Sequence, residues 1–170
     1  MGYSANSTDA AEIKAAEKLL LAQKPYVKSY NYLALNEKSA LVSGDVIAAM
    51  MYSGDAMMVQ EHHDDIVYVL PDEGGNIWAD YLVVMESSRN KDLAFAFINF
   101  LNKPENAAQL AEFVYYATPN KAAEKLLPAE FLDDPVIYPS KEALKKSEFH
   151  NPLPPRASKK RNLAISKILK

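Results

Sequence analysis

Short apolar runs alternate along this chain with longer segments of helical periodicity, and this alternation constrains the fold more than any other feature. Residues 46–52 form a continuous apolar run of strand length, typical of a strand buried on both faces of a parallel sheet. Residues 65–70 and 76–84 are predicted to be two further strands, joined by a Pro-Asp-Glu-Gly-Gly turn at 71–75. Strands interleaved with helices predict the α/β fold class.

Helical spacing of apolar residues predicts three long helices, at residues 9–23, 91–101 and 104–115. Asp9 and Glu12 have the spacing of a capping box at the start of the first, and Pro104 suits the first turn of the third. Shorter helices are expected at 56–62 and 121–127. A basic helix at 158–170 is expected to end the chain.

Composition excludes several classes of protein. With 49% hydrophobic and 24% charged residues, the 170-residue chain has the balance of a soluble globular protein, and no apolar run approaches the roughly 20 residues that span a bilayer. The chain has no cysteine, which excludes disulfides, thiolate zinc sites and cysteine nucleophiles. A net charge of −3 argues against nucleic acid as a partner. The first nine residues contain no signal peptide.

The pair His62-His63, followed by Asp64-Asp65, is the one cluster that suggests a metal or an enzyme active site. Adjacent side chains point in different directions on a helix or a strand, so they rarely converge on one ion. A solvated turn is the favoured interpretation. Gly74-Gly75 lacks the further glycines of a dinucleotide or phosphate loop, and no nucleophile motif is present. We therefore predict no catalytic residue, metal ligand or cofactor.

The segment Trp78-Ala79-Asp80 combines the only tryptophan with a carboxylate. Residues two apart on a strand share a face, so Trp78 and Asp80 would project together. An aromatic wall beside a carboxylate suits an organic ammonium ion, through cation–π attraction and a charge-assisted hydrogen bond. The alternative is a core tryptophan next to a surface carboxylate, and the pattern alone favours that alternative.

Several segments resemble the spermidine/putrescine-binding proteins of bacterial ABC importers, in the order and spacing of that family. The most specific is the Pro-x-Glu-Gly-Gly-x-x-Trp-x-Asp pattern. The matching segments are residues 2–9, 52–56, 71–80, 98–101, 116–120 and 148–151.

The resemblance covers only the second half of such a protein, so the chain is interpreted as a C-terminal fragment or truncated product. It implies a periplasmic-binding-protein type II-like fold with two lobes, of which this chain supplies mainly the second. Residues 1–77 would form the α/β core of the second lobe. Residues 78–125 would contain the hinge crossing and a remnant of the first lobe, and residues 126–170 would return to the second.

The resemblance also implies which residues face the ligand. Trp78 matches the aromatic residue that packs along the polyamine, and Asp80 matches the carboxylate that holds an ammonium group. Tyr52 and Tyr116 match aromatic residues that line the cleft. His150 stands where some members have Gln, which changes the available donors and acceptors.

Asp55, in the Tyr-Ser-Gly-Asp segment, is either an added carboxylate for the ligand or the cap of the following helix, and the cap is favoured. The implied function is solute binding without chemistry, for a membrane permease that imports spermidine or putrescine. Three alternatives remain: a protein of the same fold that binds another small cation or solute, a metal-dependent enzyme using His62-His63, and an inert fragment with no activity alone.

The implied location is periplasmic, or extracytoplasmic with a membrane anchor. Apolar residues of the predicted helix at 91–101, including Phe95, Phe97, Ile98 and Phe100, would lack a covering partner in a half-length chain. Self-association of the fragment is therefore expected.

Overall fold

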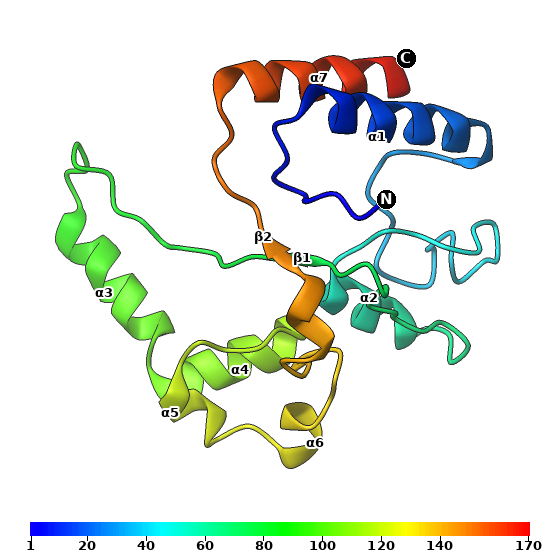
Figure 1. Ribbon diagram of the computed structural model, residues 1–170. Coiled ribbons are helices and arrows are strands. Elements are labelled where there is room, and N and C mark those ends of the chain that lie inside the picture. Colours follow the sequence, from blue (N-terminus) through cyan, green and yellow to red (C-terminus); the bar gives the residue numbers. More distant parts are fainter. The chain divides into compact units, whose positions relative to one another are not determined.

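The computed structural model describes residues 1–170, which divide into two compact units (Figure 1). Unit 1 consists of Met1–Tyr32, Pro71–Trp78 and Lys146–Lys170. Unit 2 consists of Leu33–Leu70 and Ala79–Lys145. The chain therefore passes between the units several times, and each unit is assembled from segments far apart in sequence.

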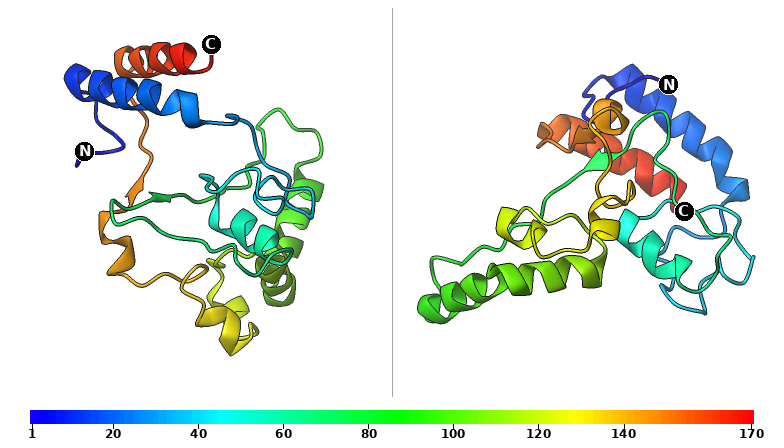
Figure 2. Two further views of the ribbon diagram at one scale, coloured as in Figure 1. Left: turned by 90° about the vertical axis from the view of Figure 1, so that its right-hand side faces the viewer. Right: turned by 90° about the horizontal axis from the view of Figure 1, so that it is seen from below.

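Unit 1 is built on two helices, α1 (Ala10–Gln23) and α7 (Pro155–Ile168), with the short 3-10 helix η1 (Lys24–Tyr26) extending α1. Asp9 caps α1 by accepting hydrogen bonds from the N–H groups of Ala11 (2.7 Å) and Glu12 (3.0 Å), which lowers the pKa of its carboxyl group. Helix α7 lies along α1 in every view (Figures 1 and 2). The buried residues of the pair are Ile13, Ala157, Ala164 and Ile168.

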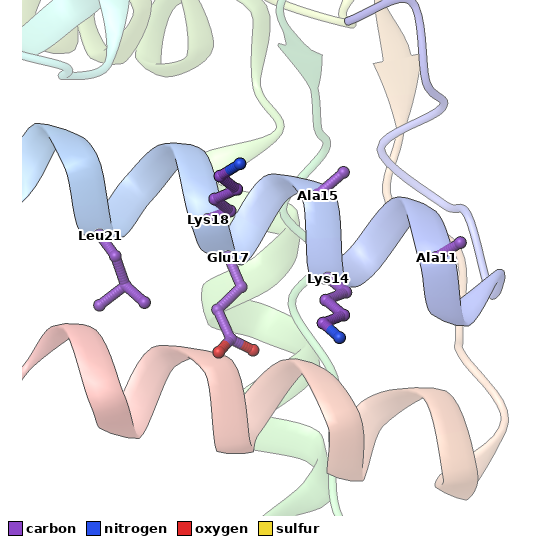
Figure 3. A pocket seen from close by; sticks show the side chains of 6 residues that line it. All are labelled: Ala11, Lys14, Ala15, Glu17, Lys18 and Leu21. Carbon is purple, nitrogen blue, oxygen red and sulfur yellow. The ribbon is translucent and has the colours of Figure 1, made fainter.

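Polar contacts fix the register of α7 on the N-terminal segment. The Arg161 guanidinium donates to the backbone carbonyls of Ala5 (2.8 Å) and Ser7 (2.5 Å). One turn and a half further on, Lys167 Nζ lies 2.6 Å from Glu17 Oε1. Figure 3 shows the Glu17 side chain pointing from α1 toward α7. The two helices thus run parallel, with the start of α1 beside the first half of α7.

A hydrogen-bond network joins the N-terminal motif to residues 148–151. Asn6 Nδ2 donates to Glu148 Oε2 (3.0 Å) and to the Phe149 carbonyl (2.8 Å), and Asn6 Oδ1 accepts from the Asn151 N–H (2.7 Å). Ser4 Oγ donates to the same Glu148 oxygen at 2.6 Å. The hydrogen bond from the Ser4 hydroxyl lowers the pKa of the Glu148 carboxyl group, and the hydrogen bond from the Asn6 side chain acts in the same direction.

The sheet of unit 1 has two strands, β1 (Asn76–Ile77) and β2 (Glu148–Phe149), paired in parallel with Asn76 opposite Glu148 and Ile77 opposite Phe149. Gly74, at φ +94°, precedes β1, and a Cβ there would lie 2.5 Å from the backbone carbon of Lys146. Only glycine combines this conformation with such a close approach. The Gly-Gly turn therefore seats β1 directly against β2.

Unit 2 is mainly helical. Its helices are α2 (Ser53–Gln60), α3 (Lys91–Leu101), α4 (Pro104–Val114), α5 (Lys121–Glu124) and α6 (Ala129–Leu132), and the 3-10 helix η2 (Ala143–Lys146) leads out of the unit. The core packs α4 against α5, α6 and the segment after them. Its buried residues are Ala108, Ala111, Ala123, Leu127, Phe131 and Ile137. The rings of Phe131 and Tyr138 meet edge to face, 6.2 Å apart.

Helix α3 has apolar side chains over most of its surface, with Lys91, Asp92 and Asn99 along one side, yet none of its residues is buried. Leu93, Phe97 and Phe100 lie on one face at helical spacing, and Phe95 lies on the opposite face; their exposed fractions range from 52% to 71%. A helix with this pattern is normally a core helix. The expected exposure is confirmed for Phe95, Phe97 and Phe100, whereas Ile98 is partly buried.

The long helices predicted from the sequence are confirmed, with ends within one residue, and the terminal basic helix begins three residues earlier than predicted. Helix α2 likewise starts three residues earlier, and α5 ends three residues earlier. The strands predicted at 46–52 and 65–70 are wrong, and the one predicted at 76–84 is reduced to β1. A strand exists only when a neighbour completes its hydrogen-bond ladder, and no segment of the chain pairs with these residues.

Candidate ligand-binding site

The predicted ligand residues Tyr52 and Tyr116 come together in unit 2. Tyr52 is the N-cap residue of α2, in extended conformation, and Tyr116 follows the C-terminus of α4. Gly54, in the first turn of α2, is buried against Val114 and the Tyr116 ring, and a Cβ there would lie 2.7 Å from Cζ of Tyr116. The glycine thus lets the aromatic ring lie on the start of the helix.

The backbone before Tyr116 is unusual. Tyr115 ends α4 in the left-handed region, at φ 55°, and is the only non-glycine residue with positive φ. Its hydroxyl donates a hydrogen bond to Glu61, just after α2, and this carboxylate raises the pKa of Tyr115. Because a left-handed residue reverses the chain direction, Tyr115 directs Tyr116 back toward α2.

Asp55 belongs to the same cluster. The favoured sequence interpretation, that Asp55 caps α2, is wrong, because the helix begins at Ser53 and Tyr52 is the N-cap. Burial raises the pKa of the Asp55 carboxyl group. Burial, followed by the charge of Asp55, raises the pKa of Tyr116 to about 12, while the backbone N–H groups of Gly54 and Asp55 act in the opposite direction. A carboxylate thus lies within electrostatic reach of the Tyr116 hydroxyl.

Trp78 and His150 lie in unit 1, at the same end of its sheet. Trp78 follows β1 and His150 follows β2, so they come directly after the paired residues Ile77 and Phe149. Trp78 and His150 are both exposed. The parallel pairing therefore places an aromatic ring and an imidazole at adjacent positions beyond the strand ends.

Asp80 is exposed and belongs to unit 2, two residues beyond the boundary at Trp78. The strand from which Trp78 and Asp80 were predicted to share a face ends at Ile77, so that derivation is wrong. The structure therefore gathers Tyr52, Asp55 and Tyr116 in one unit, and Trp78 and His150 in the other.

Other candidate sites contain none of these residues. His62 and His63 lie in a turn where His63 Nδ1 accepts a hydrogen bond from the Asp65 N–H (3.3 Å), and the chain has no group of three metal-ligating side chains. A hollow of about 460 Å³ beside α1 is lined by α1 alone (Figure 3). None of the helices combines the length and apolar character needed to cross a membrane.

Sequence reasoning undervalued two groups. It weighed Asp55 chiefly as a cap, although its place in the Tyr-Ser-Gly-Asp segment beside a predicted cleft tyrosine was a signal for a site carboxylate. It also missed the network that Asn6 makes with Glu148. The presence of both residues in segments of family resemblance was the available signal.

Comparison with known proteins agrees with the arrangement of the segments. The profile of the bacterial extracellular solute-binding protein family matches residues 1–139. The spermidine/putrescine-binding periplasmic protein of Escherichia coli (strain K12) is 38% identical over 151 residues, which are 89% of this chain and 43% of the relative. The chain thus spans less than half the length of this curated relative.

Solved structures match nearly the whole chain. One from Listeria monocytogenes, named for a spermidine/putrescine ABC transporter, is 36% identical with a TM-score of 0.83; the match covers 98% of this chain and 51% of that one. The substrate-binding protein of a spermidine/putrescine ABC transporter from Streptococcus pneumoniae is 33% identical with a TM-score of 0.78, over the same shares. The predicted type II periplasmic-binding-protein fold is confirmed, for about half of such a protein. The chain belongs to the family of bacterial extracellular solute-binding proteins.

Proposed function

We propose that this chain is part of the substrate-binding subunit of an ABC importer and that its ligand is a polyamine such as spermidine or putrescine. The observation that carries the proposal is the cluster of Tyr52, Asp55 and Tyr116. It combines aromatic rings with a carboxylate in a fold shared with proteins named for these ligands. Such a cluster attracts an organic cation through its aromatic faces and its negative charge.

The proposed mechanism is binding without chemistry. The faces of Tyr52 and Trp78 would contact the methylene chain and attract the ammonium groups by cation–π interaction. Asp55 and Asp80 would supply the negative charge. The raised pKa of Asp55 means that burial disfavours its charged form, and an arriving ammonium ion would offset that penalty. Tyr116 keeps its proton far above neutral pH, so it remains a hydrogen-bond donor.

The proposed partners and location follow from the same similarity. A liganded binding protein would dock on a membrane permease, on the periplasmic or extracytoplasmic side, with no role for nucleic acid. We keep the predicted lobe assignment: residues 1–77 in the second lobe, 78–125 at the crossing and in the first lobe, and 126–170 back in the second. Closure of two lobes would present the liganded shape to the permease.

The test is calorimetric titration of spermidine and putrescine into a protein that carries this chain together with the other half of the two-lobed fold. We expect Asp80→Asn to cost about 3–5 kcal/mol of binding free energy, because a buried ammonium loses its counter-charge. Trp78→Phe keeps most of the apolar wall and should cost about 1 kcal/mol. Tyr52→Phe and Tyr116→Phe should cost no more than that, since each removes one hydroxyl.

Asp55→Asn should also weaken binding, and Asp65→Asn, an exposed substitution of equal charge in the same unit, is its control. Wild-type affinity for polyamine in the Asp80→Asn and Asp55→Asn variants would contradict the proposal. No measurable polyamine binding by the wild-type two-lobed protein, with tight binding of a different solute, would favour another ligand for the same fold.

A further inference from the structure

The end of the chain carries a concentration of positive charge. Residues 152–170 contain six of the nineteen basic residues and none of the twenty-two acidic ones, so this segment is +6 in a chain of net charge −3. Two of the six are engaged inside unit 1: Arg161 on the carbonyls of Ala5 and Ser7, and Lys167 on Glu17. The remaining four are Arg156, Lys159, Lys160 and Lys170.

The basic residues form a stripe along α7. At about 3.6 residues per turn, five residues of α7 fall within a sector of about 100°. They are Arg156, Lys159, Lys160, Leu163 and Lys167, spaced at intervals of three, one, three and four residues. The buried residues Ala157, Ala164 and Ile168 lie on the neighbouring side of the helix, next to Lys160 and Lys167, and Lys167 pairs with Glu17 of α1. Arg156, Lys159 and Leu163, on the other side of the stripe, therefore face away from the core of unit 1.

The stripe is open to solvent at Arg156, Lys159 and Leu163. Arg156 and Lys159 are exposed, and Lys160 is partly exposed and lies within electrostatic reach of the Asp9 carboxylate. Leu163, 53% exposed, lies in the middle of the stripe. A leucine surrounded by cations on an exposed helical face does not contribute to the core, and the pairing suits a surface with anionic groups above an apolar layer.

We propose that the basic stripe of α7, formed by Arg156, Lys159, Lys160 and Leu163, docks on the surface of a membrane that carries anionic lipid headgroups. Basic clusters on a helix bind such surfaces electrostatically, and a single apolar side chain can enter the headgroup boundary. The stripe lies in unit 1 and uses none of the ligand residues, so this proposal is independent of the polyamine assignment.

The test is co-sedimentation of the chain with vesicles of phosphatidylcholine containing 30% phosphatidylglycerol, against vesicles of phosphatidylcholine alone. We expect binding to the anionic vesicles only, falling steeply as salt rises. The triple variant Arg156→Gln, Lys159→Gln, Lys160→Gln should weaken partitioning at least tenfold. About 1 kcal/mol per basic residue sets an upper limit of about a hundredfold.

A matched control is Lys91→Gln, Lys103→Gln, Lys125→Gln, which removes the same charge from exposed positions of unit 2. It should bind as the wild type does apart from a small general effect of net charge. Leu163→Ser should weaken partitioning further than Leu126→Ser, an exposed leucine of similar accessibility elsewhere. Circular dichroism shows whether each variant retains its helices.

An equal loss of vesicle binding in the triple variant and in its control would contradict the proposal, because binding would then depend on net charge rather than on the stripe. Binding to neutral vesicles as strong as to anionic ones would contradict it too. So would an absence of vesicle binding together with stripe-dependent dimers in sedimentation velocity. That result would assign the stripe to the acidic surface of a second copy.

Discussion

At the scale of single residues, Gly54 shows how one missing side chain assembles the candidate site. Its backbone conformation is an ordinary helical one, so conformational freedom does not explain the glycine. Space does: the Tyr116 ring and the Val114 carbonyl occupy the position where a Cβ would lie. The glycine is therefore required by the packing of Tyr116 on α2.

We predict that Gly54→Ala destabilises the chain by about 1–3 kcal/mol, because Tyr116 or the end of α4 must move to admit the methyl group. Urea denaturation measures the change in unfolding free energy. Gly44→Ala is the control: Gly44 has φ +73° but open space around its Cβ position, so it should lose only about 1 kcal/mol through backbone strain. Equal stability of Gly54→Ala and wild type would show that Tyr116 does not rest on this glycine.

Glu148 gives a residue-level prediction for pH. Its pKa is lowered in the folded state, so the carboxylate stabilises unit 1 above the unfolded-state pKa, near 4.5, and this contribution is lost as pH falls through the folded-state value. The unfolding midpoint in urea, measured from about pH 6 to about pH 3, should fall with acidity less steeply in Glu148→Gln than in wild type. Identical slopes would show that the contacts of Glu148 with Ser4 and Asn6 do not favour the charged form.

At the scale of elements, α3 is the helix whose sequence and surroundings disagree. Its apolar residues cover most of its surface, a pattern that normally packs against a core, but apart from its contact with α4 this surface stays largely exposed. The same disagreement holds for the extended segments at 46–52 and 65–70. Each has an apolar composition suited to a buried strand, and neither is paired with another strand. In all three segments, the apolar side chains lack a covering element among these 170 residues.

We predict that α3 drives self-association of the chain on its own. The double variant Phe97→Lys, Phe100→Lys places two charges on one exposed aromatic face of α3. Because charged side chains oppose apolar association, sedimentation velocity should show a shift from oligomer toward monomer. Leu126→Lys introduces a charge at a similarly exposed apolar position outside α3 and should leave the distribution unchanged. A wild-type chain that stays monomeric at high micromolar concentration would contradict this expectation.

At the scale of the whole molecule, the number of contacts that a ligand can make limits its affinity. Solvated ammonium groups on a one-sided aromatic surface gain only about 0.5–1 kcal/mol per cation–π contact, whereas micromolar affinity requires about 8 kcal/mol. The chain spans 43% of the Escherichia coli relative and 51% of the Listeria structure. Isolated, it is expected to offer only part of a cleft.

We therefore predict that calorimetry finds weak or unmeasurable binding of spermidine and putrescine to the 170-residue chain by itself, and that binding appears when the other half of the fold is added. The same titration with the Asp80→Asn chain serves as the control for nonspecific attraction to an acidic protein. Micromolar binding by the monomeric chain alone would contradict this prediction, because the 170 residues would then contain a complete binding site.

Local sequence determined the parts of the structure that need only local interactions. The Asp9 cap, the ends of α3 and α4, and the turn at 71–75 could be predicted, since helix capping, 3.6-residue periodicity and glycine-rich turns act within a few residues. Family resemblance identified the segments of the candidate site. Both kinds of signal can be recognised in the sequence, because neither depends on which distant segment packs against the residues concerned.

Only the tertiary structure decided which of those segments meet. Asn6 reaches Glu148 across more than 140 residues, and Tyr116 rests on Gly54 because Tyr115 turns the chain in a left-handed conformation that no residue pattern announced. The predicted strands at 46–52 and 65–70 were wrong for the converse reason. Apolar composition specifies that a segment should be buried, but a β-ladder also needs a second strand at hydrogen-bonding distance, and this chain brings none to them.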